Sequence, residues 1–163
     1  MAHFVYQTEG FVIKKGERGE AGLYLLIFSK EFGLIWVEAQ GVRDIKSKLR
    51  PYLNLYSLGQ FSLVATKNGN WRLVGVESRA VIFYLFSYYR RQLVANWALL
   101  INRFLDYNEK QIDLYNDFIS ALNTLAQKDL TSEQIKSLEA IFILRLLSHL
   151  GYRPRPNFCH DFL

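Results

Sequence analysis

The sequence predicts an α+β fold, in which an all-β N-terminal domain over residues 1–77 precedes an all-α helical domain over residues 78–163. Two observations carry this prediction. Short apolar segments separated by glycine turns fill the first part, whereas apolar residues at helical spacing fill the second. Because 50% of the 163 residues are hydrophobic, the chain has enough apolar surface for a core.

Strand-sized apolar segments rich in aromatic and β-branched residues recur in the first part. They are residues 4–6, 11–13, 23–28, 34–39, 61–65 and 71–76, with turn residues at 16–22, 31–33 and Gly41. Asn68-Gly69-Asn70 is a hairpin signal, since Asn and Gly tolerate positive φ. About five short strands predict a small closed or nearly closed barrel, because a flat sheet of this size would leave its edges exposed.

Three helices are expected in the second part, the first over residues 81–105. The second carries a stripe spaced by three and four residues: Tyr115, Phe118, Ile119, Leu122 and Leu125. Thr131 and Gln134 have the spacing of a capping box and open the third helix, whose apolar positions are Ile135, Leu138, Ile141, Phe142 and Leu146. Gly151 and Pro154 predict its end.

Composition limits the classes of function and the compartment. The formal net charge of +5 permits a polyanionic partner without identifying one. Because Cys159 is the single cysteine, the chain cannot form an internal disulfide, and a reducing compartment, the cytoplasm, is favoured. A zinc site built from several thiolates is excluded for the same reason. The start of the chain lacks the pattern of a signal peptide. The apolar region over 80–105 is interrupted by Arg90, Arg91, Asn102 and Arg103, so a buried helix is expected there and no membrane association.

Two groups of motifs, in order along the chain, resemble one protein family. The first group is Gly10-Phe11-Val12-Ile13, residues 23–28, Ser29-Lys30-Glu31-Phe32-Gly33, and Gly41-Val42-Arg43 with Lys46-Ser47-Lys48. The second is the helix end over residues 142–147 followed by Leu150-Gly151-Tyr152-Arg153-Pro154. In their order and spacing these motifs resemble the RecO family of recombination mediators, over most of the chain. Many members continue with a four-cysteine zinc site, whereas here only Cys159 lies near its first position; a natural short form and a truncated chain both stay open.

The resemblance implies an N-terminal OB fold and a helical C-terminal domain. We expect no cofactor and no metal, because Cys159 and His160 alone cannot complete a tetrahedral site. The resemblance further implies binding and annealing of single-stranded DNA in the cytoplasm of a bacterium, at the nucleoid. The expected protein partners are a RecR-like protein and the acidic C-terminal tail of single-strand binding protein, through which the family helps RecA to load.

The strongest candidate for DNA contact is the basic loop formed by Arg43, Lys46, Lys48 and Arg50. Phosphate contacts dominate nucleic-acid affinity, and a cationic loop beside a strand suits them. A solvated loop that keeps the protein in solution is the alternative, and the resemblance favours DNA. Lys14 and Lys15, with Arg18, form a smaller cluster, for which a solvated hairpin tip is the simpler interpretation because Glu17 and Glu20 dilute its charge.

Aromatic side chains are candidates because single strands are also held by base stacking. The candidates are Tyr24, Phe32, Trp36, Tyr52, Tyr56 and Trp71, although most aromatics of a small barrel belong to its core. Tyr52 and Tyr56 rank first because they follow the basic loop directly. Trp36 lies in a segment that is apolar on both sides, so the sequence leaves open whether it faces the core or a ligand.

Arg90, Arg91 and Arg145 lie within otherwise apolar helices and are candidates to bind an acidic partner tail, since Arg pairs bidentately with carboxylates. For each residue alone, an ordinary solvent-facing or snorkelling arginine is the simpler interpretation.

The sequence has no phosphate-binding glycine loop and no nucleophile elbow, so we expect a protein that is not an enzyme. The remaining rivals are an adaptor that has lost DNA binding and a small enzyme using carboxylates near Asp113 and Asp117, which share a helix face.

Overall fold

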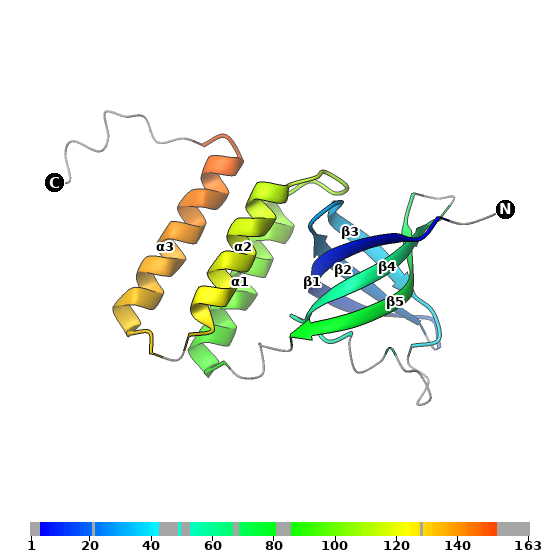
Figure 1. The fold of residues 1–163 in the computed structure, drawn as a ribbon, viewed down its shortest axis with the longest axis horizontal. Coiled ribbons are helices and arrows are strands. Elements are labelled where there is room, and N and C mark those ends of the chain that lie inside the picture. The colour runs from blue at the N-terminus through cyan, green and yellow to red at the C-terminus, as the bar shows by residue number, and fades with distance from the viewer. Residues whose placement is uncertain are drawn as a thin grey trace. The chain divides into compact units, whose positions relative to one another are not determined.

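The computed structural model describes residues 4–20, 22–42, 49, 53–66, 69–80, 86–127 and 129–152, and it confirms the α+β fold. Five strands precede three helices along the chain (Figure 1). The elements are β1 (Tyr6–Arg18), β2 (Gly22–Ser29), β3 (Gly33–Ala39), β4 (Leu58–Ala65), β5 (Trp71–Ala80), α1 (Tyr88–Phe104), α2 (Ile112–Leu125) and α3 (Ser132–His149).

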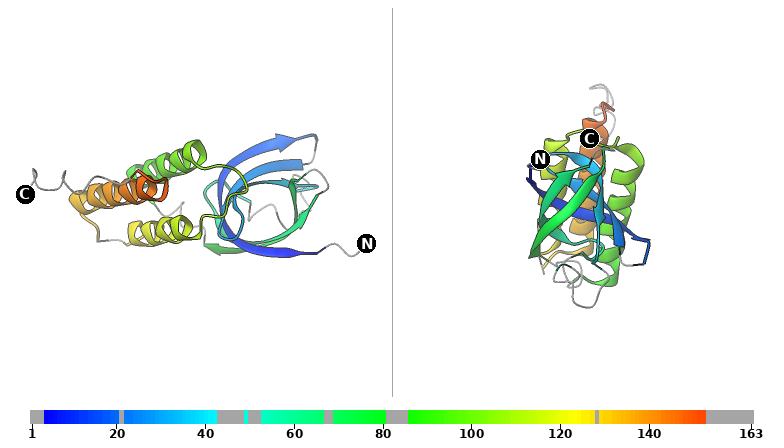
Figure 2. Two further views of the ribbon diagram at one scale, coloured as in Figure 1. Left: turned by 90° about the horizontal axis from the view of Figure 1, so that it is seen from above. Right: turned by 90° about the vertical axis from the view of Figure 1, so that its right-hand side faces the viewer.

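The strands form a closed barrel in the order β1-β2-β3-β5-β4, and their curvature is visible in Figure 2. All neighbours are antiparallel except β3 and β5, which run parallel. This parallel seam consists of two residue pairs, Val37 with Trp71 and Glu38 with Arg72. Alternate residues of each strand fill the interior with aliphatic side chains and Phe61, which is fully buried. The closed barrel predicted from short strands is therefore confirmed.

β1 is longer than the sequence indicated. The sequence predicts the segments 4–6 and 11–13 as separate strands, but Tyr6 and residues 11–13 lie in one strand that also includes Gly16. The first half of β1 pairs with β4 and its second half with β2, so one strand serves two neighbours around the barrel. A register shift between Val12 and Lys14 accompanies the change of neighbour. The turn itself falls at Gly19, where φ is +59°.

The chain divides into two compact units, residues 1–115 and 116–163. The first unit includes α1, which contacts β1 and buries the stripe Leu93, Val94, Trp97, Ala98 and Ile101. β5 runs to Ala80, and α1 begins at Tyr88, later than the helix start expected at residue 81. The domain boundary between residues 77 and 78 stays a prediction.

The loop after α1 is fixed to the edge of β3. The backbone N–H of Asn108 donates to the carbonyl oxygen of Leu34 across 2.9 Å, and Leu34 forms a parallel bridge with Tyr107. Gly33 makes this approach possible: its φ is +67°, and a Cβ at this position would lie 1.8 Å from the carbonyl oxygen of Glu109. The glycine turn predicted over residues 31–33 is thus also a docking point for a distant loop.

Two predicted signals of the third helix, its capping box and its end at Gly151, are confirmed in the second unit, while Pro154 lies outside the described residues. The Thr131 hydroxyl accepts from the backbone N–H of Gln134 at 3.2 Å, and the Gln134 side chain accepts from the backbone N–H of Thr131 at 2.8 Å. Gly151 ends the helix at φ +85°. Between α2 and α3 the rings of Phe118 and Phe142 lie 5.9 Å apart. Within the described ranges, no helix is both long enough and apolar enough to cross a membrane.

Candidate nucleic-acid interface

Trp36 faces the outside of the barrel. Its neighbours Ile35 and Val37 are fully buried in the barrel interior, whereas Trp36 is partly exposed. Its ring stacks on Tyr24 of β2, with ring centroids 4.8 Å apart and planes inclined by 22°. Tyr107, which is 49% exposed, continues the series at 6.4 Å from Trp36. We call Tyr24, Trp36 and Tyr107 the aromatic row.

Strand register places cations on the same outward side as the aromatic row. Gly16 of β1 lies directly across from Tyr24, so the residue paired with Tyr24 on that strand has no side chain. Because side chains alternate along a strand, Lys14 and Arg18 point to the side of Tyr24, and Lys15 points to the opposite side. Both lysines are exposed. The predicted Lys14–Lys15 cluster is therefore divided between two faces, and only Lys14 joins the row.

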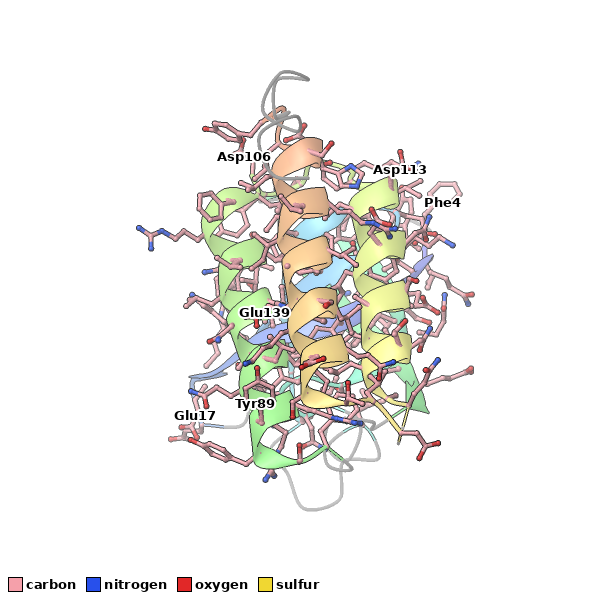
Figure 3. The ribbon with its side chains drawn as sticks, turned by 90° about the vertical axis from the view of Figure 1, so that its left-hand side faces the viewer. Phe4, Glu17, Tyr89, Asp106, Asp113 and Glu139 are labelled. Atoms are coloured by element: carbon pink, nitrogen blue, oxygen red, sulfur yellow. The ribbon has the colours of Figure 1, made fainter. Side chains whose placement is uncertain are left out.

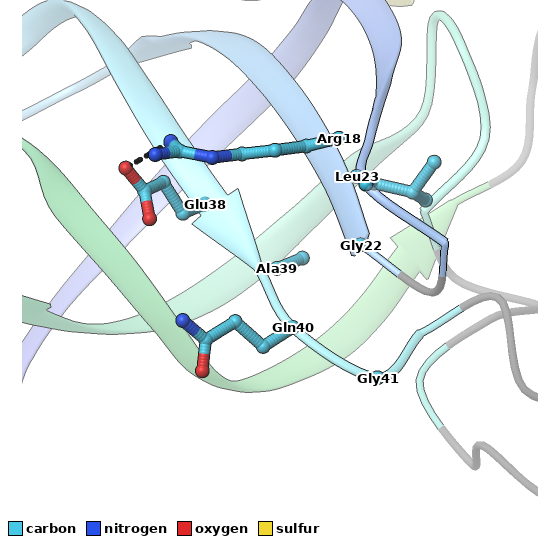
Figure 4. A pocket seen from close by; sticks show the side chains of 8 residues that line it. Arg18, Gly22, Leu23, Glu38, Ala39, Gln40 and Gly41 are labelled. Carbon is cyan, nitrogen blue, oxygen red and sulfur yellow. Dashed lines mark hydrogen bonds and ion pairs between the residues drawn. The ribbon is translucent and has the colours of Figure 1, made fainter.

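Arg18 is held against the row by two contacts. Its guanidinium carbon lies 5.2 Å from the centroid of the Tyr24 ring, within the range of a cation–π contact. The same guanidinium forms an ion pair with Glu38 of β3 (Figure 4). Glu38 lies directly across from Tyr24 in the register. A hollow of about 210 Å³ adjoins the pair, lined by Arg18, Gly19, Gly22, Leu23, Glu38, Ala39, Gln40 and Gly41.

The other part of the same outer face is closed. Leu26, Phe28 and Leu34 share the outward side of β2 and β3 with the row, yet all three are fully buried. Tyr115 packs on Phe28 with ring centroids 5.3 Å apart, and its hydroxyl donates to the Glu9 carboxylate at 3.2 Å. One face of the barrel is thus part core and part open surface, and the aromatic row lies on the open part.

The four cations of the basic loop, Arg43, Lys46, Lys48 and Arg50, lie outside the described residues. Tyr52, one of the two residues ranked first for stacking, also lies outside them. Their roles stay predictions.

Tyr56, the other residue ranked first for stacking, is described. It is half-buried with φ +61°, and its ring stacks on the buried Phe11 with centroids 6.1 Å apart. Burial raises the pKa of its hydroxyl. Tyr56 therefore packs on the barrel wall at Phe11, and its proposed contact with a base stays a prediction.

The remaining candidate aromatics form a separate group. The rings of Phe32 and Trp71 lie 4.6 Å apart and pack against the barrel core, with Tyr6 edge-on to both. Of the row, sequence reasoning identified Tyr24 and Trp36 as candidates but missed Tyr107. Tyr107 reaches the row only because its loop binds β3, and no local pattern signals that contact.

Arg145, one of the three predicted partner-binding arginines, lies on α3 beside a hollow. Its guanidinium donates to the Asp117 carboxylate at 2.7 Å, and His149 lies 2.9 Å from the other oxygen. A hollow of about 200 Å³ between α2 and α3 is lined by Asp117, Ser120, Ala121, Thr124, Leu138, Ile141, Phe142 and Arg145. A wider hollow of about 590 Å³ shares Thr124, Leu138 and Ile141 with it.

Arg90 and Arg91 lie near the start of α1, in the first compact unit, and both are half-buried.

The carboxylates named as candidates for catalysis, Asp113 and Asp117, lie in two different settings. Asp117 bridges Arg145 and His149, and Asp113 projects from the first turn of α2, where a negative charge suits the helix dipole (Figure 3). Among the residues that the structure describes, no group of three or more metal-ligating side chains occurs.

The fold and this face define a class of protein: a five-stranded barrel of OB type, followed by a helical part, with an aromatic and cationic outer surface. Sequence comparisons agree. The family described as "Recombination protein O N terminal" matches residues 1–77, and that described as "Recombination protein O C terminal" matches residues 87–161. The chain belongs to the RecO family.

Among similar curated proteins, "DNA repair protein RecO" of Acetivibrio thermocellus is 31% identical over 157 residues, covering 94% of this chain and 60% of the relative. The protein of the same name from Desulfitobacterium hafniense is 28% identical, covering 96% of this chain and 56% of the relative. That of Synechocystis is 44% identical over 63 residues, 39% of this chain and 23% of the relative. The chain thus spans less than two thirds of the length of these relatives.

Proposed function

We propose that this chain is a RecO-type mediator of DNA repair and recombination in the bacterial cytoplasm, acting at the nucleoid. It binds single-stranded DNA, promotes strand annealing and helps to load recombinase onto DNA coated with single-strand binding protein. The observation that carries the proposal is the Tyr24–Trp36 stack, which has Lys14 and Arg18 on its outward side. Family membership and the names of the relatives support the same function.

In the proposed mode of binding, bases continue the aromatic row and phosphates meet the cations beside it. Tyr107 is the half-exposed end of the row, where a base adds to the stack. The basic loop from Arg43 to Arg50 begins two residues after Gly41, which lines the hollow beside Arg18. We infer that the cations of this loop extend the phosphate path.

The test is fluorescence anisotropy of a labelled single-stranded oligonucleotide at 50 and 200 mM salt. Four phosphate contacts predict an affinity loss of about fifty-fold across this range, from a slope near −0.7 per contact. Replacing Lys46, Lys48 and Arg50 by Ala reduces both the affinity and the slope. Absence of binding at 50 mM salt contradicts the proposal. A matched RNA strand tests whether DNA is preferred.

We propose that the hollow between α2 and α3 binds the acidic tail of single-strand binding protein. A RecR-like protein is proposed as a second protein partner. Ile141, 48% exposed, offers an apolar surface beside Arg145, whose guanidinium suits a carboxylate. This hollow also favours the second candidate function, an adaptor of the same fold without DNA binding. If the chain is an adaptor, it is expected to bind an acidic peptide with an apolar end and not to bind single-stranded DNA. The substitution Arg145→Ala is expected to abolish binding of the peptide.

The proposed mediator carries out no covalent chemistry. Annealing of complementary strands is therefore expected to proceed in EDTA at the rate seen in its absence. A requirement for a divalent metal would instead favour the enzyme that uses carboxylates near Asp113.

A further inference from the structure

We propose that Glu38 holds Arg18 over the Tyr24 ring in the DNA-free protein, and that this ion pair sets the affinity of the aromatic row for single strands. The inference rests on the proposed binding of single-stranded DNA. It assigns a regulatory role to an acidic residue within a face that is otherwise cationic and aromatic.

The ion pair occupies the place that a base needs. Arg18 lies over the Tyr24 ring at 5.2 Å, and Trp36 stacks on the same ring at 4.8 Å. In the register Arg18 pairs with Gly22 and Trp36 with Leu26, one on each side of Tyr24 along β2, so we infer that the two side chains flank the ring when no DNA is bound. A base can stack on Tyr24 only after the guanidinium has moved away.

The two partners differ in their freedom to move. The Arg18 side chain is 54% exposed, whereas the Glu38 side chain is 17% exposed. Glu38 is fixed on β3 directly across from Tyr24, so its charge remains at the row when the pair opens. Arg18 lies at the end of β1 beside the turn at Gly19, and it is the partner that swings out.

DNA supplies a better partner for Arg18. An ion pair this exposed contributes little stability, and a bond from Arg to phosphate is charge-assisted and often bidentate. When a phosphate takes Arg18, the Tyr24 ring is uncovered for stacking, but the Glu38 carboxylate is left beside the strand and repels it. Opening the pair and this repulsion both subtract from the affinity, so removing the carboxylate raises it.

The decisive experiment is a double-mutant cycle of Glu38→Gln and Arg18→Gln, measured by anisotropy with a labelled single strand. Glu38→Gln is expected to tighten binding about fivefold, the change expected when one exposed ion pair no longer has to open. Glu77→Gln is the matched control, because Glu77 is an exposed carboxylate of β5 and its loss changes the net charge equally. In the Arg18→Gln background there is no pair to open, so the gain from Glu38→Gln is expected to be smaller than in the wild type and to keep only the part that comes from relief of repulsion.

A second measurement follows Arg18 directly. The side-chain Nε–H signal of Arg18 in the NMR spectrum is expected to shift on addition of the single strand and, without DNA, on Glu38→Gln. Equal effects of Glu38→Gln and Glu77→Gln, with wild-type binding intact, overturn the role of Glu38 and leave the proposed function standing. Absence of single-strand binding by both the wild type and Glu38→Gln overturns both.

Discussion

Tyr107 lies 6.4 Å from Trp36 because the loop that carries it is bound to β3 through the backbone of Leu34. A residue from between two helices thus completes an aromatic surface on the barrel. The row is an assembly of three segments distant in sequence, and its geometry depends on how closely this loop approaches the strand.

The approach of the loop depends on Gly33. Gly33→Ala is expected to lower the free energy of unfolding by more than the roughly 1–2 kcal/mol that a left-handed conformation costs an L-residue. The added Cβ would lie 1.8 Å from the Glu109 carbonyl oxygen, so the loop has to move away from β3. Gly41→Ala is the matched control, because Gly41 has the same φ of +67° and no atom within 4 Å of its Cβ position. Urea unfolding measures both, and equal losses would contradict the docking of the loop.

Tyr107 itself tests the end of the row. Tyr107→Ala is expected to weaken binding of a single strand by roughly 5- to 150-fold, the equivalent of about 1–3 kcal/mol for one stacked base. The control is Tyr88→Ala on α1, where an aromatic ring is 74% exposed and lies outside the row. Thermal unfolding of both variants checks that the fold is retained. An unchanged affinity of Tyr107→Ala would exclude stacking at this end.

The two adjacent lysines of β1 are expected to differ in their effect on DNA binding. Lys14 shares the outward side with the aromatic row and Lys15 does not, so Lys14→Ala should reduce the salt slope by about 0.7 and Lys15→Ala by less. Titrations at several salt concentrations measure both slopes. Because the two substitutions remove the same charge at neighbouring positions, each serves as the control for the other. Equal slopes would show that DNA does not follow the face that carries the aromatic row.

Because of Tyr56, the free energy of unfolding of the protein is expected to fall at alkaline pH. Because burial raises the pKa of its hydroxyl in the fold, the neutral form is favoured there. Its contribution to stability is complete below the unfolded pKa of about 10 and is lost as pH rises from there through the folded pKa. Tyr56→Phe has no such group, so its free energy of unfolding should fall less between pH 9 and pH 11. Tyr88→Phe, at an exposed ring, should follow the wild type.

Local signals in the sequence predicted local structure well. The capping box of Thr131 and Gln134, the helix end at Gly151 and the glycine turn at Gly33 all depend on a few adjacent residues, and all three are present. The apolar stripe of the second helix is equally local, and Tyr115 and Phe118 are buried as expected.

Contacts between distant residues could not be predicted in the same way. Trp36 stayed ambiguous because β2 and β3 are apolar on both sides: Ile35 fills the barrel, while Leu34 is buried on the outer side. Alternation is lost wherever a strand is covered on both faces. The pairing of Asp117 with Arg145 joins two helices, and neither helix alone signals it. The sequence divides β1 into separate segments because the polar residues 7–9 interrupt its apolar pattern, whereas pairing with β4 and β2 makes it one strand.

The parallel seam gives the barrel an unequal resistance to opening. Four of the five contacts between neighbouring strands are antiparallel ladders of six or more pairs, whereas two pairs join β3 to β5. Local unfolding starts where few hydrogen bonds have to break. Backbone amides that are hydrogen-bonded across this seam are therefore expected to exchange with solvent when β3 and β5 briefly separate, whereas those between β1 and β2 are expected to exchange only when the whole barrel unfolds.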